Sequence, residues 1–249
     1  MFALDHRWPL GLDRKNWPDH AAALIFVLFV LVFFDVWVSQ SLQAWPDVWR
    51  APFSFITDFG LSDWVLIPAL LVFVLTLLAL LLPLSRYRPV IFELSLVSSF
   101  FLVGVGVPGL VANGLKRLFG RARPEHYLET GGFHFQHFLN DWTFQSFPSG
   151  HATTAIGTAF LVSFMAPRFF RLILLIAVMT GLSRIVIGMH YPTDVVAGFA
   201  IGMLGAYAAR NIYARRRWLF AFRTDGTVRF RGTPHLRRAW RRLFQRARA

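Results

Sequence analysis

The sequence predicts an all-α integral membrane protein with six transmembrane helices. Of its 249 residues, 55% are hydrophobic and only 16% are charged, a composition far from that of soluble domains. A helix that crosses the hydrocarbon core needs about 20 apolar residues. Apolar runs of roughly this length occupy residues 21–39, 64–84, 90–115, 152–167, 169–188 and 193–213. We expect one membrane domain, 1–249, with a core at 90–213 and a basic tail at 214–249.

The first and third runs each carry an acid near one end. Asp35 lies in the first run and Glu93 in the third. Ionisable groups inside membranes are expensive and often functional, but at the ends of spans we expect carboxylates that lie at the interface or have a partner. The first run follows basic residues, as in a signal peptide, yet no small-residue cleavage site follows it. We therefore expect a retained membrane anchor.

The basic residues set the orientation. Residues 210–249 contain 13 arginines and one acid, Asp225, so this end carries +12 of the formal net charge of +13. The positive-inside rule predicts that this end is cytoplasmic. With an even number of spans, the N-terminus is then cytoplasmic too. The loops at residues 40–63, 116–151 and 188–192 are expected at the outer, periplasmic face.

Three polar stretches interrupt the apolar sequence. They are KRLFGRARP at residues 116–124, PSGH at 148–151 and SRIVIGMHYPTD at 183–194. The first closes the third span, the second opens the fourth, and the last joins the fifth to the sixth. All three should therefore lie at one membrane face and form one site. Lys116, Arg117, Arg121 and Arg123 oppose the positive-inside rule in an outer loop, which indicates a role other than topology.

These stretches carry the groups that bind phosphate. If the third helix continues beyond its span, Lys116 and Arg123 lie two turns apart on one helix face. Arg184 adds another cation, and guanidinium groups match phosphate oxygens through paired hydrogen bonds. Ser149 and Gly150 begin a helix, where free backbone N–H groups favour an oxyanion. The combination predicts a phosphate cradle.

Two histidines and one carboxylate supply reactive groups. His190 and Asp194 are four residues apart, and Pro192 between them suits the first turn of a helix. Asp194 can orient His190 as a nucleophile, while His151 can protonate a departing oxygen. A metal site built from these three residues is the alternative. It is disfavoured because the three neighbouring cations would repel a divalent ion.

The motif order resembles that of the type 2 phosphatidic acid phosphatase superfamily. The pattern is Lys-x6-Arg-Pro, then Pro-Ser-Gly-His, then Ser-Arg-x5-His-x3-Asp. Every signature position is filled, by Lys116, Arg123, Pro124, Pro148, Ser149, Gly150, His151, Ser183, Arg184, His190 and Asp194. The first two spans and the tail carry no part of the signature.

The resemblance implies a role for each signature side chain. His190 would attack phosphorus and form a phosphohistidine, Asp194 would orient it, and His151 would protonate the leaving group. The phosphoryl oxygens would be held by Lys116, Arg123, Ser149, Gly150 and Arg184. Members of this family work without a metal, so no cofactor is expected.

The expected function is removal of phosphate from a lipid phosphate or lipid pyrophosphate, at the outer face of a bacterial inner (plasma) membrane. Undecaprenyl pyrophosphate is the first candidate substrate, followed by phosphatidic acid and phosphatidylglycerol phosphate, and lipid A is a further option. One alternative is a lipid-to-lipid phosphotransferase with the same site. Another is a lipid carrier with a silent site.

Two flanking segments have predicted contacts with the membrane. Apolar residues repeat at helical spacing from Leu236 to Ala247 among arginines, which predicts a basic amphipathic helix on anionic inner-leaflet lipids. Nucleic-acid binding is the alternative for this tail, but no recognition motif accompanies it. The aromatic connection at residues 44–64 is expected at the outer interface, where it would flank the route of a lipid substrate.

Overall fold

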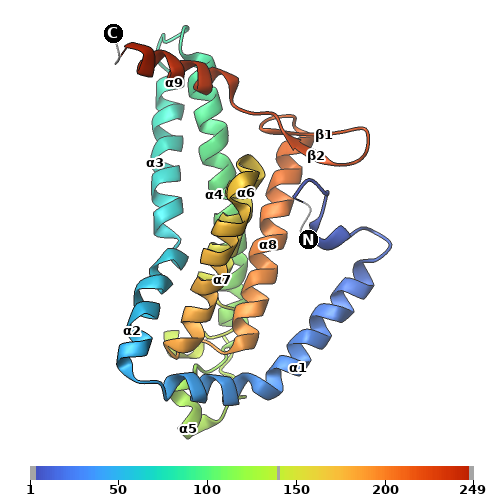
Figure 1. Cartoon of the computed structure of the whole chain (residues 1–249), viewed down its shortest axis with the longest axis vertical. Coiled ribbons are helices and arrows are strands. Elements are labelled where there is room, and N and C mark those ends of the chain that lie inside the picture. Colours follow the sequence, from blue (N-terminus) through green and yellow to red (C-terminus); the bar gives the residue numbers. More distant parts are fainter. Residues whose placement is uncertain (1–3, 139–140, 247–249) are drawn as a thin grey trace.

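The computed structural model describes residues 4–138 and 141–246, which form a bundle of long helices (Figure 1). The longer helices are α1 (Trp17–Gln43), α2 (Asp47–Ile56), α3 (Asp63–Leu80), α4 (Arg88–Phe119), α6 (Gly150–Met165), α7 (Phe170–Val186), α8 (Pro192–Arg215) and α9 (Pro234–Arg246). The shorter elements are α5 (Tyr127–Thr130), strands β1 (Phe220–Phe222) and β2 (Val228–Phe230), and the 3-10 turns η1 (Pro9–Gly11), η2 (Thr57–Gly60), η3 (Pro124–His126), η4 (Trp142–Phe144) and η5 (Pro167–Phe169).

The helices follow the predicted apolar runs, and the all-α prediction for the membrane region is confirmed. Within the described part of the chain, five helical segments are long and apolar enough to cross a membrane: Trp17–Gln43, Asp47–Leu80, Arg88–Phe119, Pro167–Val186 and Pro192–Arg215. The predicted run at 152–167 forms α6. With 16 residues, α6 is the shortest of the helices that the six predicted apolar runs form.

Helix α6 lies inside the bundle, where it packs against α4, α7 and α8. Small residues allow α6 and α8 to approach closely. A Cβ atom added to Gly202 of α8 would lie only 2.2 Å from the Thr153 carbonyl oxygen of α6. This close approach draws together the first turns of α6 and α8, where the backbone N–H of Ser149 donates to the Asp194 carbonyl oxygen at 2.9 Å.

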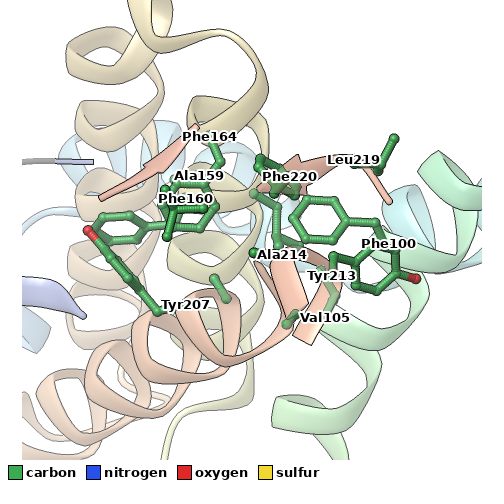
Figure 2. Packing of buried hydrophobic residues seen from close by; sticks show 14 of the residues in the cluster. Phe100, Val105, Ala159, Phe160, Phe164, Tyr207, Tyr213, Ala214, Leu219 and Phe220 are labelled. Carbon is green, nitrogen blue, oxygen red and sulfur yellow. The ribbon is translucent and has the colours of Figure 1, made fainter. Parts of the chain in front are cut away.

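Aromatic side chains fill the bundle away from these first turns (Figure 2). The rings of Phe164 and Tyr207 meet edge to face with centroids 4.9 Å apart, and Phe100 lies 5.1 Å from both Tyr213 and Phe220. Edge-to-face pairs of buried rings add to the stability that apolar burial provides. The aromatic cluster therefore anchors the ends of α4, α6 and α8 that lie far from the polar stretches.

Part of the basic tail packs into the bundle, which the sequence did not predict. Strands β1 and β2 form an antiparallel hairpin, and Leu219, Phe220 and Val228 pack into the aromatic cluster. Arg210, counted with the tail charges, is buried and donates to the carbonyl oxygens of Leu4 and His6. Apolar side chains between the arginines explain the hairpin, because their burial outweighs the polarity of the segment.

Helix α9 lies across the end of the bundle, beside α4 (Figure 1). Glu93 of α4 accepts the backbone N–H groups of His235 at 3.2 Å and Leu236 at 2.8 Å. A carboxylate at this position accepts hydrogen bonds from free N–H groups in the first turn and interacts favourably with the positive end of the helix dipole. Glu93 thus has a partner, as expected for an acid at a span end. Ala247, the last residue of the predicted pattern, lies outside the described residues.

We predict that Gly202→Ala destabilises the bundle, because the added methyl group overlaps the α6 backbone. The free energy of unfolding should fall by about 1–3 kcal/mol, the usual effect of overpacking. Gly114→Ala on α4 is the matched control, since an added Cβ there meets nothing within 4 Å. It should leave stability unchanged or raise it by up to about 1 kcal/mol through helix propensity. Unfolding of both variants in detergent measures the difference, and equal stabilities would contradict this account of the α6–α8 contact.

Candidate active site

The three polar stretches meet at one end of the bundle, as predicted. This is the end near α5 in Figure 1, where α6 and α8 begin and α4 and α7 end. A cavity of about 630 Å³ opens there. Six of the predicted site residues line it: Lys116, Arg123, Gly150, His151, Arg184 and His190. Ser149 and Asp194 are buried behind them.

Two of the cations reach the cavity by different routes. Lys116 projects from the last turn of α4, and its Nζ donates to the Gln145 carbonyl oxygen at 2.7 Å. The prediction that Arg123 lies on a continuation of this helix is wrong. The helix ends at Phe119 because Gly120 adopts a left-handed conformation, with φ of 62°. Arg123 instead lies in the following loop, where its guanidinium carbon is 4.7 Å from the centre of the Trp142 ring.

The turn η2 supports the other side of the cavity. Arg184 of α7 is 7% exposed, and its Nη1 donates to Thr57 Oγ1 at 2.8 Å. Gly60 lies so close to His151 that an added Cβ would be 2.7 Å from the histidine Cβ. Gly60, Leu61 and Ser62 also line the cavity. The connection between α1 and α3 therefore borders the site.

The first turn of α6 presents backbone groups to the cavity. Ser149 is the N-cap residue, and its Oγ accepts the N–H of Ala152 at 3.4 Å. Its hydroxyl is thus used in capping the helix, whereas Gly150 lines the cavity. Without a side chain, Gly150 lets a ligand approach the N–H groups of this turn.

His190 follows α7 and lies against the buried carboxylate of Asp194. Its Nδ1 is 3.5 Å from Asp194 Oδ2 and 3.5 Å from Ser146 Oγ, separations at the long end of hydrogen bonding. Ser146 Oγ donates to the same carboxylate oxygen at 2.5 Å, and the N–H of Tyr191 donates to it at 2.9 Å. Because Nδ1 faces these groups, Nε2 is the ring nitrogen available to the cavity that His190 lines.

The environment keeps the imidazole of His190 neutral. Burial lowers the pKa of His190 well below its usual value, and the positive charges of Lys116 and Arg184 act in the same direction. The hydrogen bond to Asp194 opposes these effects without reversing them. A neutral imidazole has a free lone pair on one nitrogen, as a nucleophile requires.

Three residues around Asp194 were not assigned to the site from the sequence. Ser146 lies in a loop and gave no sequence signal. Arg121 Nη1 donates to Asp194 Oδ1 at 2.8 Å, and Arg121 Nη2 donates to Asp35 Oδ2 at 2.9 Å. Two signals did point to this pair: Arg121 opposes the positive-inside rule, and Asp35 places a charge in an apolar helix.

The residues that the structure describes contain no group of three or more His, Asp or Glu side chains placed to hold a metal ion. In the alternative built from His151, His190 and Asp194, the carboxylate would have to be a ligand. Both Asp194 oxygens already accept hydrogen bonds, from Arg121, Ser146 and the N–H of Tyr191.

A cationic cavity at the end of an apolar helical bundle defines a membrane protein that acts on phosphate groups. Comparison with known proteins agrees with this class. The model of the PAP2 superfamily matches residues 94–218, half of the chain, and the chain belongs to this superfamily. It is accordingly a membrane lipid phosphatase, which argues against the carrier alternative.

Several relatives are similar over most of the chain. A lipid A 1-phosphatase of Rhizobium johnstonii is 32% identical over 231 residues, which cover 90% of this chain and 93% of that protein. A lipid A 1-phosphatase of Rhizobium etli is 34% identical and covers 80% and 86%. A putative undecaprenyl-diphosphatase of Escherichia coli is 31% identical over a shorter region, 45% of this chain and 54% of that protein.

The fold also resembles a solved structure. The crystal structure of a transmembrane PAP2 type phosphatidylglycerolphosphate phosphatase from Bacillus subtilis matches with a TM-score of 0.52 and 21% identity. The match covers 78% of this chain and 96% of that chain. At this identity the likeness concerns the fold alone.

We predict that Ser146→Ala lowers kcat/KM, because Asp194 loses a hydrogen bond and His190 loses a neighbour that limits its motion. A hydrogen bond to a charged group contributes about 1.5–3 kcal/mol, so the decrease should be about tenfold or more. Ser163→Ala is the matched control: both serines are fully buried, but Ser163 donates to the Ala159 carbonyl oxygen inside α6. Phosphate release by the two purified variants, at equal folded concentration, makes the comparison, and equal rates would contradict the role given to Ser146.

Proposed function

We propose that this phosphatase transfers the phosphoryl group of a lipid phosphate to His190 and then to water. The observation that carries the proposal is the shared cavity of Lys116, Arg123, Arg184, His151 and His190. In such a cavity, fixed cations can stabilise the phosphoryl oxygens while one histidine attacks phosphorus and the other protonates the leaving oxygen.

The proposed reaction has two steps. In the first, Nε2 of His190 attacks phosphorus, the bond from phosphorus to the lipid oxygen breaks, and His151 gives that oxygen a proton. In the second, water attacks phosphorus, the bond from phosphorus to His190 breaks, and a water proton returns to His151. Inorganic phosphate leaves and the enzyme regains its starting state. Hydrolysis of phosphate esters is among the slowest uncatalysed reactions, so both the cations and the covalent step are needed.

The cavity also suits a lipid. Beyond the charged residues it continues along apolar side chains of α3 and α4: Leu66, Ile67, Leu70, Leu102, Val105 and Leu110, with Gly106 and Gly109 between them. An acyl or prenyl chain that lies here would reach the phosphate site from the side of the bundle. Burial of each methylene contributes about 0.8 kcal/mol, so this apolar arm would favour lipids over soluble phosphate esters.

The proposed substrate is lipid A carrying a 1-phosphate, which changes the order of candidates from the sequence. The support is the similarity, over 80–90% of this chain, to two proteins named lipid A 1-phosphatase. Undecaprenyl pyrophosphate, the first candidate from the sequence, becomes the second, supported by the shorter match to a putative undecaprenyl-diphosphatase. Phosphatidic acid and phosphatidylglycerol phosphate follow.

The proposed topology has six spans in a bacterial inner membrane, with both termini in the cytoplasm and the active site at the periplasmic face. Helix α6 would be the fourth span and would complete the set of six, since its 16 residues extend about 24 Å and other helices enclose it. Arg210 joins the N-terminal segment to the end of α8, which supports a shared side for the termini. The arginine-rich end, including α9, would lie on anionic lipids of the inner leaflet.

The central experiment measures free phosphate released from a panel of lipids by the purified protein in detergent, with a chelator present. The panel comprises lipid A 1-phosphate, undecaprenyl pyrophosphate, phosphatidic acid and phosphatidylglycerol phosphate. We expect chelator-resistant release, fastest from lipid A 1-phosphate, and a loss of at least about 10³-fold in His190→Ala and about 10²-fold or more in His151→Ala.

Trapping of the intermediate complements this assay. Brief reaction with a lipid labelled in its phosphate, followed by alkaline quenching, should leave label on the wild-type protein and none on His190→Ala. Label that persists in His190→Ala, or activity that the chelator abolishes, would overturn the proposed mechanism. Label that passes to a second lipid, without free phosphate, would identify the phosphotransferase instead.

We predict that Gly106→Leu weakens lipid use selectively. Gly106 lines the apolar arm, and an added Cβ there meets only Leu66, at 3.8 Å, so we expect the leucine side chain to extend into the arm. KM for the lipid should rise about tenfold through lost apolar contacts, while kcat/KM for a short soluble phosphate ester stays unchanged. Gly114→Leu is the control on the same helix, because it does not line the cavity and has no neighbour within 4 Å. Equal effects on the lipid and the soluble ester would exclude this position for the lipid chain.

A further inference from the structure

We propose that Asp35 and Arg121 are positioning residues for catalysis: they hold the Asp194 carboxylate behind His190 and set the electrostatic potential at the nucleophile. The inference rests on the proposed role of His190. It concerns a helix that the match to the superfamily does not reach, because α1 ends before residue 94.

Helix α1 joins the site through a polar contact. Its composition is that of a lipid-facing span, and among its residues 17–43 only Asp35 and Ser39 are buried. The N-terminal half of α1 leans away from the other helices in Figure 1. A carboxylate is therefore the main group that this helix inserts into the bundle. Burial of a charge in an apolar span is costly unless the charge is paired, so its retention indicates a use.

Asp35 is fully enclosed and satisfied at both oxygens. Oδ1 accepts the backbone N–H of Thr193, a residue in the first turn of α8, at 2.9 Å. Oδ2 accepts the Thr193 hydroxyl at 2.5 Å and Arg121 Nη2 at 2.9 Å. Asp35 thus caps the helix that carries Asp194, from a different part of the chain, and fixes the guanidinium beside it.

Arg121 connects both groups that contact Nδ1 of His190. Its side chain holds Asp194 through Nη1 at 2.8 Å, and its carbonyl oxygen accepts the N–H of Ser146 at 3.0 Å. The guanidinium carbon lies 4.2 Å from the centre of the Tyr191 ring, which limits its movement. At 4% exposure, Arg121 has no access to the cavity and does not line it. It can act on the reaction only through its neighbours.

One guanidinium shared by two carboxylates gives the site a defined charge. Burial alone would lower the pKa of Arg121, but Asp194 and Asp35 raise it overall, so the cation is permanent. If Arg121 paired with Asp194 alone, it would neutralise the carboxylate that orients His190. Because Asp35 takes half of the fork, Asp194 keeps negative character toward the imidazole. A guanidinium suits this division, since its planar donors bind two acceptors at once.

The two residues should therefore move the pKa of His190 in opposite directions. The charged groups that act on His190 are Asp194 of α8, Lys116 of α4 and Arg184 of α7, and Arg121 lies behind Asp194 with Asp35 behind it. Arg123 and His151 line the same cavity as His190 and are unchanged in every variant. Loss of the negative charge of Asp35 disfavours the imidazolium and lowers its pKa. Loss of the positive charge of Arg121 favours the imidazolium and raises it. A purely structural pair would destabilise the protein and leave this pKa unchanged.

The test is the pH dependence of kcat/KM, whose acid limb reports protonation of the nucleophile in the free enzyme. Compared with the wild type, we expect Asp35→Asn to move this limb to lower pH and Arg121→Gln to move it to higher pH, each by about one unit. Arg121→Lys keeps the charge but loses the fork, so its limb should stay near that of the wild type while kcat falls at least about tenfold. Limbs that coincide with the wild type in Asp35→Asn and Arg121→Gln would overturn the proposal.

Two further variants keep the test decisive. Glu93→Gln changes another buried carboxylate, which accepts two backbone N–H groups at the opposite end of the bundle, so the acid limb of this variant should not move. If a single variant fails to fold, the double variant Asp35→Asn/Arg121→Gln removes both charges of the pair together, and Asp194 keeps its hydrogen bonds from Ser146 and the N–H of Tyr191. Its kcat should still fall at least about tenfold, and a wild-type kcat would overturn the proposal. Absence of activity in the wild type, or activity retained in His190→Ala, would instead count against the proposed function.

Discussion

The active site depends on the enclosure of one carboxylate. Asp194 is fully buried, and its oxygens accept hydrogen bonds from Arg121, Ser146 and the backbone of Tyr191. A buried charge with fewer partners would be unstable or would take up a proton. These partners come from the loop after α4, the loop before α6 and the turn before α8. The geometry of Asp194 therefore requires that these segments converge, and with them His190.

Helix packing makes this convergence rigid. The small residues between α6 and α8 bring their backbones together, and the Ser149 N–H then binds the Asp194 carbonyl oxygen. Closely packed helices cannot approach each other without atomic overlap or separate without losing contacts, so they resist small displacements. Reactive groups that come from three helices can thus keep their relative positions without a covalent crosslink. The chain contains no cysteine, so packing and hydrogen bonds are the means available.

The sequence predicted the gathering of the motifs because helix direction and span number decide which ends meet. It did not predict the path from Lys116 to Arg123. The helix ends because Gly120 adopts a left-handed conformation, and the presence of a single glycine in a sequence does not show that it adopts this conformation. The hairpin was missed because its strands have three residues each, too few for a periodic pattern. The partner of Asp35 was missed because it lies 86 residues away, at Arg121. Local pattern identifies a buried charge but not the group that neutralises it.

The aromatic cluster at the far end of the bundle has a consequence for the membrane as a whole. The active-site cavity opens at one end of the bundle, and a continuous file of water from there to the other end would conduct protons. Phe100, Phe164, Tyr207 and Phe220 belong to the buried apolar cluster of the bundle, and Figure 2 shows their rings packed together. Apolar side chains offer water few hydrogen-bond partners, so a buried aromatic cluster disfavours a column of water. The hairpin that brings Phe220 into the cluster thus helps to close the bundle at the end opposite the cavity, and such a closure would limit the leakage of protons past an enzyme whose site opens at one end only.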